Sequence, residues 1–189
     1  MRVIAGRFKK TKLVAPKTFS TRPVLDQVKE AIFNILFNIS DMQVLDLFAG
    51  SGSMGIEALS RDAAHCTFVE NGKLALKAIS ENIAKCSLQP ENLVIPTSVQ
   101  SAITQLEKKK KSFDLIFVDP PYLKNLLNPT LAKLAKSSLI HEESIIVAEH
   151  HPKEPIEADK LGLVLTDERR YGQTLISFLA LCPQKEEDV

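Results

Sequence analysis

The chain has few cysteines and no long apolar run. Its three cysteines are scattered among 189 residues and form no CxxC pair, so neither a disulfide framework nor a zinc site is predicted. We therefore expect reduced thiols and no bound metal. Apolar runs such as "LISFLALC" are far shorter than the roughly 20 residues that span a bilayer. The N-terminus lacks the apolar core of a secretory signal, so we expect a cytoplasmic protein without membrane contact.

Acidic residues are absent from the first 25 positions. Seven basic residues lie there, while the rest of the chain holds 17 basic and all 23 acidic residues. A positive arm on a mildly acidic body is typical of proteins that bind a polyanion, although a solubilising tail has the same composition. The candidate nucleic-acid contacts are Arg2, Arg7, Lys9, Lys10, Lys12 and Arg22.

Strands and helices alternate along most of the chain. After a possible N-terminal hairpin, apolar spacing predicts a helix over residues 24–39. Strands are then predicted over residues 42–48, 65–70, 92–97, 113–119 and 143–150, with helices over 52–61, 73–86, 99–108 and 128–138. Residues 162–181 offer two β-rich pieces around Gly172. This alternation predicts a mostly parallel sheet covered on both faces.

We expect one domain, because 189 residues is an ordinary domain length. Within it, residues 1–40 form a basic hairpin and helix, residues 41–182 a Rossmann-like core, and residues 183–189 a polar tail.

Three glycines follow the first strand of this core, in "VLDLFAGSGSMG". Gly50, Gly52 and Gly55 fit the spacing G-x-G-x-x-G, and Glu70 closes the next strand about 20 residues after Gly50. Glycines allow a tight turn close to a ligand, and an acid at the second strand end can accept both hydroxyls of a ribose. The turn therefore predicts a cofactor that contains adenosine.

An acid inside the first strand favours one such cofactor. Asp46 lies four residues before Gly50, where a carboxylate suits the cationic methionine group of S-adenosylmethionine and would repel the pyrophosphate of NAD. The pattern D-x-F-x-G-x-G, from Asp46 to Gly52, looks like motif I of the class I methyltransferases. An NAD-dependent oxidoreductase is the alternative, but it predicts a Tyr-x-x-x-Lys pair, which the chain lacks.

The stretch "FDLIFVDPPY" ends a strand on an acid, two prolines and an aromatic ring. Ligands of an open parallel sheet lie beyond the carboxyl ends of its strands, so we expect Asp119 beside the glycine turn. Pro120 and Pro121 restrict the backbone, and the Asp119 carboxylate and Pro120 carbonyl can accept hydrogen bonds from the NH₂ group of a planar base. Tyr122 offers a ring for stacking. Because the ring alone stacks, we expect Tyr122→Phe to be mild.

Two histidines, His150 and His151, end a strand at the same edge. Methylation of an amine needs no base before the transfer, because the nitrogen becomes acidic only afterwards. We therefore interpret both as loop or target contacts.

Several segments together resemble one family. "DPPY" is similar to motif IV, [DNS]-P-P-[YFW], of enzymes that methylate adenine N6 or guanine N2. "MRVIAGRFKKTKL", "TRPVLDQVKEAIFNIL", "LDLFAGSGSMGIEALSRDA" and "RRYGQTLISF" look like the start, first helix, cofactor block and last strand pair of the RsmD family, which methylates a guanine N2 of bacterial 16S rRNA. The likeness extends to about residue 180. Val24, Gln27 and Lys29 stand where the family has Thr, Arg and Arg.

The resemblance implies an α/β fold of the class I S-adenosylmethionine-dependent type. Its sheet would have seven mostly parallel strands, an antiparallel C-terminal hairpin and a small N-terminal β/α extension. The implied catalytic residues are Asp119, Pro120, Pro121 and Tyr122, and the implied cofactor contacts are Asp46, Phe48, Ala49, Gly50, Ser51, Gly52, Glu70, Asn71 and Ser98. Ser98 stands where the family has an Asp or Asn that reads adenine. The implied substrate is 16S rRNA in a partly assembled small subunit, and we expect a monomer.

Two alternatives share the motifs. An adenine-N6 methyltransferase acting on DNA or RNA would use the same motif IV, but 189 residues leave little room for a target-recognition region. A non-catalytic rRNA-binding module is disfavoured because "DPPY" is intact.

Overall fold

A seven-stranded sheet forms the centre of the protein in the computed structural model, which describes residues 1–16, 24–88 and 94–183. The strand order is β3-β2-β1-β4-β5-β7-β6. Neighbours from β3 to β5 pair in parallel, and β7 is antiparallel to both β5 and β6, as the sequence predicted. The strands are β1 (Gln43–Leu47), β2 (His65–Val69), β3 (Val94–Ile95), β4 (Leu115–Val118), β5 (Ile145–His150), β6 (Leu163–Tyr171) and β7 (Thr174–Leu181).

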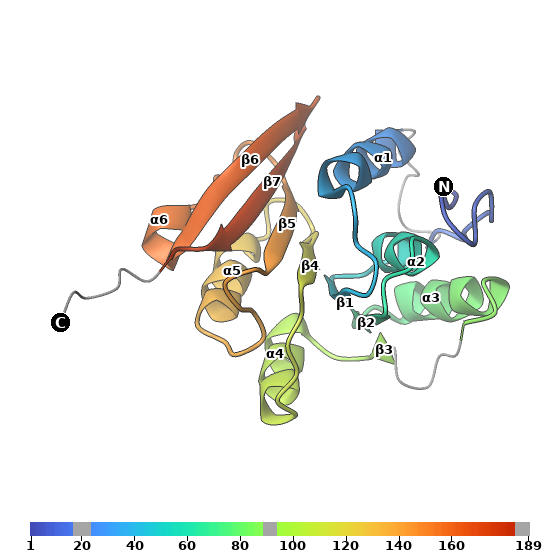
Figure 1. Ribbon diagram of the computed structural model, residues 1–189, viewed down its shortest axis with the longest axis horizontal. Helices are drawn as coiled ribbons and strands as arrows, with labels where there is room; N and C mark the ends of the chain where they lie inside the picture. Colours follow the sequence, from blue (N-terminus) through green and yellow to red (C-terminus); the bar gives the residue numbers. More distant parts are fainter. Residues whose placement is uncertain (17–23, 89–93, 184–189) are drawn as a thin grey trace.

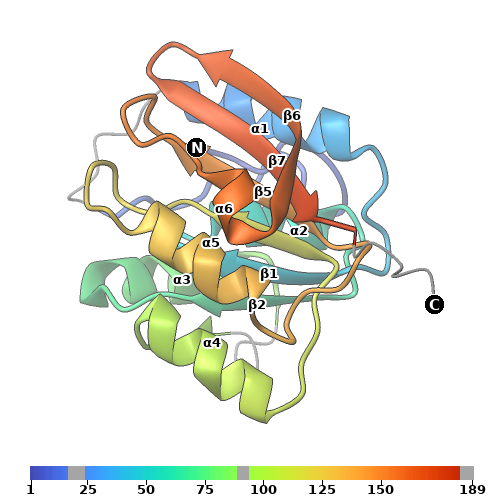
Figure 2. The ribbon, with the colours of Figure 1, turned by 90° about the vertical axis from the view of Figure 1, so that its left-hand side faces the viewer.

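Helices cover both faces of the sheet (Figure 1). One face carries α1 (Val24–Leu36), α2 (Ser53–Ser60) and α3 (Lys73–Lys85), and the other carries α4 (Val99–Lys108), α5 (Leu127–Ala135) and α6 (Ala158–Leu161). Figure 2 shows α5 and α6 in front of the strands. Each face has its own apolar core, and every residue of β4 is buried between the two. Of these elements only α6 was not predicted, because four residues are too few to show helical periodicity.

No helix in the described part of the chain combines the length and apolarity needed to cross a membrane.

The N-terminal segment folds back on itself, as predicted. Arg2 and Lys12 form an antiparallel bridge, and the Val3 amide donates to the Thr11 carbonyl at 3.0 Å. This hairpin lies close to α2. A Cβ added at Gly6, whose φ is +77°, would lie 1.7 Å from the Ser60 carbonyl oxygen, so only glycine fits there.

A buried carboxylate on α2 holds the hairpin. Glu57 is fully buried, and its two oxygens accept hydrogen bonds from the amides of Ile4 and Ala5 at 2.8 and 3.0 Å. The same carboxylate pairs with Lys29 of α1 at 3.1 Å and with Arg61 at 2.9 Å. Burial lowers the pKa of Lys29, while the Glu57 charge opposes that shift. Lys29 is therefore an internal charge rather than a surface one.

Glu57→Gln tests this anchor. The change leaves the Lys29 charge buried beside a neutral amide, so we expect the free energy of unfolding to fall by about 3–5 kcal/mol in a urea titration. Glu81→Gln, on the exposed side of α3, is the matched control and should stay within about 0.5 kcal/mol of the unmutated protein. Equal stability of the two variants would contradict the anchoring role of Glu57.

Candidate active site

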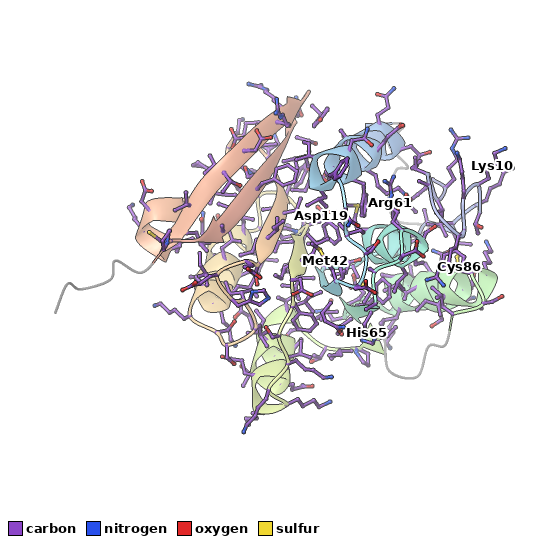
Figure 3. All side chains as sticks on the ribbon, in the orientation of Figure 1. Lys10, Met42, Arg61, His65, Cys86 and Asp119 are labelled. Carbon is purple, nitrogen blue, oxygen red and sulfur yellow. The ribbon has the colours of Figure 1, made fainter. Side chains whose placement is uncertain are left out.

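The glycine turn and the DPPY corner lie side by side at one edge of the sheet. β1 and β4 are adjacent, with Leu47 paired to Val118, and the Asp119 amide donates to the Leu47 carbonyl at 3.4 Å. Figure 3 shows Asp119 at the end of β4. The two segments predicted to bind cofactor and target thus leave neighbouring strands at the same end.

The backbone of the turn is unusually bent. Phe48, Gly50 and Gly52 have φ values of 60°, 58° and 75°, all in the left-handed region. Glycine adopts that conformation readily, whereas Phe48 does so at a cost. Gly52 also lies against the Phe68 ring, which a Cβ would approach to 3.3 Å. The chain can therefore turn here with little side-chain bulk.

Glu70 orders this turn. Its carboxylate accepts hydrogen bonds from the Gly50 amide at 2.9 Å and from the Asn71 and Gly72 amides at 2.8 and 2.7 Å. A carboxylate has about four acceptor positions, so it could also accept from ribose hydroxyls. Contacts of Glu70 and Asn71 with a cofactor stay predictions.

Asp46 lies beneath the turn. It is 3% exposed, and its Oδ2 accepts a hydrogen bond from the Gly55 amide at 3.0 Å, which joins β1 to the first turn of α2. Burial and, to a smaller extent, the nearby Glu70 charge raise the pKa of Asp46 to about 7, although the Gly55 hydrogen bond opposes the shift. A cation held beside this carboxyl would favour its ionised form. Contact with the methionine ammonium stays a prediction.

Ser51 faces the N-terminal hairpin. Its hydroxyl contacts the Met1 sulfur at 3.6 Å, and its carbonyl accepts from the buried side chain of Asn82 at 2.9 Å. Asn82 also exchanges two hydrogen bonds with the Val14 backbone at 2.7 and 2.9 Å. A cofactor could meet the Ser51 backbone, but the Ser51 side chain is directed elsewhere. The link through Asn82 was not predicted, because nothing in the sequence around Asn82 indicates a partner near Val14.

Ser98 caps α4 at the end of β3. Its hydroxyl accepts from the Ser101 amide at 3.3 Å and lies 2.9 Å from the Ser101 hydroxyl. β3 pairs with β2, so Ser98 stands on the same edge as Glu70. Contact with adenine stays a prediction, as do the contacts of Phe48 and the buried Ala49.

Tyr122 is held by two strands beyond β4. Its hydroxyl donates to Glu149 of β5 at 2.7 Å and lies 2.9 Å from the Thr174 hydroxyl of β7. The His151 ring contacts the tyrosine ring edge-on, with 5.9 Å between centroids. Burial and the Glu149 charge raise the pKa of the Tyr122 phenol, so the hydroxyl keeps its proton. Sequence reasoning treated the hydroxyl as dispensable and did not name Glu149 or Thr174, although Thr174 belongs to the "YGQT" stretch.

The rest of the corner is divided between surface and core. Asp119 and Pro121 are exposed, whereas Pro120 is buried.

His150, at the end of β5, is 1% exposed. Its ring nitrogens lie 3.0 Å from the Glu154 carbonyl oxygen and 2.9 Å from the Ser177 hydroxyl, and burial lowers the pKa of the ring. His150 is therefore a structural residue of β5 and not a target contact.

The basic arm presents its lysines to solvent. Lys9, Lys10 and Lys12 are exposed, and Lys10 lies at the outer end of the hairpin in Figure 3. Arg2 pairs with Asp26 at 3.7 Å and Arg7 with Asp62 at 3.0 Å. Arg7 also donates to the Leu59 carbonyl at 2.9 Å, so it helps to dock the hairpin. Arg22 lies outside the described residues.

Comparison with known proteins gives the family. The model of the family described as "Conserved hypothetical protein 95" matches residues 1–180. The chain belongs to this family. Among its relatives, "Putative rRNA methyltransferase YlbH" of Bacillus subtilis is 38% identical over 175 residues, covering 92% of this chain and 95% of that protein. "Ribosomal RNA small subunit methyltransferase D" of Escherichia coli is 32% identical over 189 residues, covering 100% of this chain and 93% of that protein.

A solved structure agrees with this family assignment. The chain titled "Putative methyltransferase yhhF from Escherichia coli" superposes with a TM-score of 0.80 at 32% identity, covering 97% of this chain and 99% of that one. Together the family and fold identify a class I S-adenosylmethionine-dependent methyltransferase of the "Conserved hypothetical protein 95" family. The residues present fit this cofactor, because Gly50 and Gly52 put no side chains on the left-handed turn and the carboxyl groups that hold the turn, Glu70 and Asp46, are acidic.

Tyr122→Phe should impair turnover more than its retained ring suggests. The change removes the hydrogen bonds to Glu149 and Thr174 that fix the ring plane, each worth about 1 kcal/mol, so we expect a loss of roughly tenfold in kcat. The measurement is methyl transfer from labelled cofactor to RNA. Tyr171→Phe, at the chain's other tyrosine, is the control and should keep kcat. A kcat of Tyr122→Phe equal to that of the control would show that the ring alone suffices.

Proposed function

We propose that the protein transfers a methyl group from S-adenosylmethionine to the exocyclic N2 of one guanine in 16S rRNA during small-subunit assembly. The observation that carries this proposal is the DPPY corner beside the glycine turn, joined by the hydrogen bond from the Asp119 amide to Leu47. The proposal also has support from the relative named for the small ribosomal subunit, 32% identical over the full chain.

The DPPY corner can orient both the NH₂ group and the ring of the target base. The Asp119 carboxylate and the Pro120 carbonyl would accept hydrogen bonds from the guanine NH₂ group. These bonds would draw the nitrogen lone pair out of conjugation with the ring. Tyr122, held by Glu149 and Thr174, would stack on the base.

Positioning of the target amine against the methyl donor then accounts for most of the rate enhancement. S-adenosylmethionine supplies an electrophilic methyl group on a sulfonium. The guanine N2 would form a bond to that methyl carbon as the sulfur–carbon bond breaks and S-adenosylhomocysteine leaves, and N2 would afterwards release one proton to water. Holding the two partners in line can lower such a barrier by roughly 7–11 kcal/mol in favourable cases.

Adenine N6 is the second candidate target. "tRNA1(Val) (adenine(37)-N6)-methyltransferase" of Shewanella putrefaciens is 34% identical over 83 residues, which is 44% of this chain and 34% of that protein. An adenine presents its NH₂ group to the same acceptors, so the product has to be identified directly.

Asp119→Ala tests the proposed chemistry in cells. In a strain without the gene, the normal chain should restore N2-methylguanosine at one position of 16S rRNA, mapped by mass spectrometry of rRNA fragments. Asp119→Ala should not restore it, because it removes an acceptor that acts most strongly in the transition state. The control Asp159→Ala, an exposed acid on α6, should restore it fully. Full restoration by Asp119→Ala would contradict the role of this carboxylate.

The basic arm predicts a salt-dependent contribution to RNA binding. The association constant for RNA falls as salt rises, and each lost phosphate contact reduces the magnitude of the slope of its logarithm against log salt by about 0.7–0.9. Replacing Lys9, Lys10 and Lys12 with Ala should therefore make this slope less steep by roughly 2–3. Cofactor affinity should not change. The control replaces the exposed lysines 109–111, which precede β4 and so lie at the end of this strand opposite to Asp119. A slope changed equally in both triple variants would show that the arm has no special role.

A further inference from the structure

The loop that follows the DPPY corner is strained. Leu123, immediately after Tyr122, has φ +58°, and Asn125 has φ +55°. Asparagine tolerates the left-handed region, but leucine rarely adopts it. The Leu123 residue is nevertheless 55% exposed, although its side chain is large and apolar. Strain of this kind persists only where the surrounding structure maintains it, and it is concentrated at functional sites.

Glu154 maintains the strain. Its two carboxylate oxygens accept hydrogen bonds from the Leu123 amide at 2.5 Å and from the Asn125 amide at 3.1 Å. The Glu154 carbonyl in turn contacts the buried His150 ring at 3.0 Å. The Asn128 side chain adds a hydrogen bond to the Pro155 carbonyl at 2.9 Å. The loop is thus fastened to the segment after β5, and Leu123 is held outward at the edge where the target base would enter.

We infer that Leu123 is an apolar wedge that packs against the RNA bases next to the target guanine. This inference rests on the proposed function. A stacked base cannot bring its amine to the corner, so the target nucleotide has to leave the stack. Apolar side chains inserted between base steps partly unstack the bases in other nucleic-acid complexes. Leu123 is adjacent to Tyr122, so one side chain could fill the gap while the other stacks on the displaced base.

The chemistry around Leu123 favours RNA over a protein partner. The next residue, Lys124, is exposed and positively charged, and it is followed by Asn125. A leucine beside a cation suits a base next to its phosphate better than it suits a broad apolar interface. Since leucine offers no hydrogen bond, it would assist unstacking without reading sequence. Leu123 would therefore be a positioning residue.

The test measures methyl transfer to small-subunit particles from cells that lack the gene. Leu123→Ala should lower kcat/KM about tenfold, the scale of losing one stacking contact, while the affinity for S-adenosylhomocysteine stays within about twofold. Leu123→Met keeps an apolar side chain of similar reach and should keep most activity. Leu165→Ala, at an apolar residue of β6 that is 46% exposed, is the control and should match the normal chain.

Two further readouts separate a wedge from a merely structural residue. Leu123→Gly should lose activity like Leu123→Ala yet unfold at the same or a higher temperature, because glycine relieves the left-handed strain. In the complex with S-adenosylhomocysteine, chemical probing should find the nucleotides beside the target more reactive with the normal chain than with Leu123→Ala.

The inference is overturned if Leu123→Ala keeps normal kcat/KM, or if its loss of activity follows a loss of cofactor affinity. Unchanged reactivity of the neighbouring nucleotides would also overturn it. Failure of the normal chain to methylate any particle would instead refute the proposed function itself.

Discussion

The parallel pairing of β1 with β4 is the constraint on which the candidate site depends. The register sets Leu47 beside Val118, so the glycine turn and the DPPY corner leave the sheet at the same level. Each segment is then fixed by its own neighbours. Glu70 and Asp46 hold the turn, and Glu149 and Thr174 hold the Tyr122 ring.

The N-terminal hairpin is fixed to the helices beside the glycine turn by side-chain hydrogen bonds. Glu57 binds its backbone from α2, and Asn82 links it to the carbonyl of Ser51 in the glycine turn. The exposed lysines of the arm therefore have a fixed position relative to the cofactor turn. An RNA bound by the arm would have a defined orientation toward Asp119.

The sequence predicts those features that depend on neighbouring residues. The alternation of strands and helices, the turn at Gly50 and the corner at Asp119 follow from local periodicity and from glycine and proline positions. Lys29, Glu57 and Asn82 could not be predicted as internal, because polar residues on a helix usually face water and the hairpin that buries Glu57 comes from more than 50 residues away. The partners of the Tyr122 hydroxyl were missed for the same reason, since β5 and β7 supply them.

The nucleoside product of the purified protein tests the central claim most directly. The protein would be incubated with methyl-labelled S-adenosylmethionine and small-subunit particles from cells without the gene, and the rRNA digested to nucleosides for mass spectrometry. The proposed function predicts labelled N2-methylguanosine from 16S rRNA. Label in N6-methyladenosine, or no label in rRNA, would contradict the account.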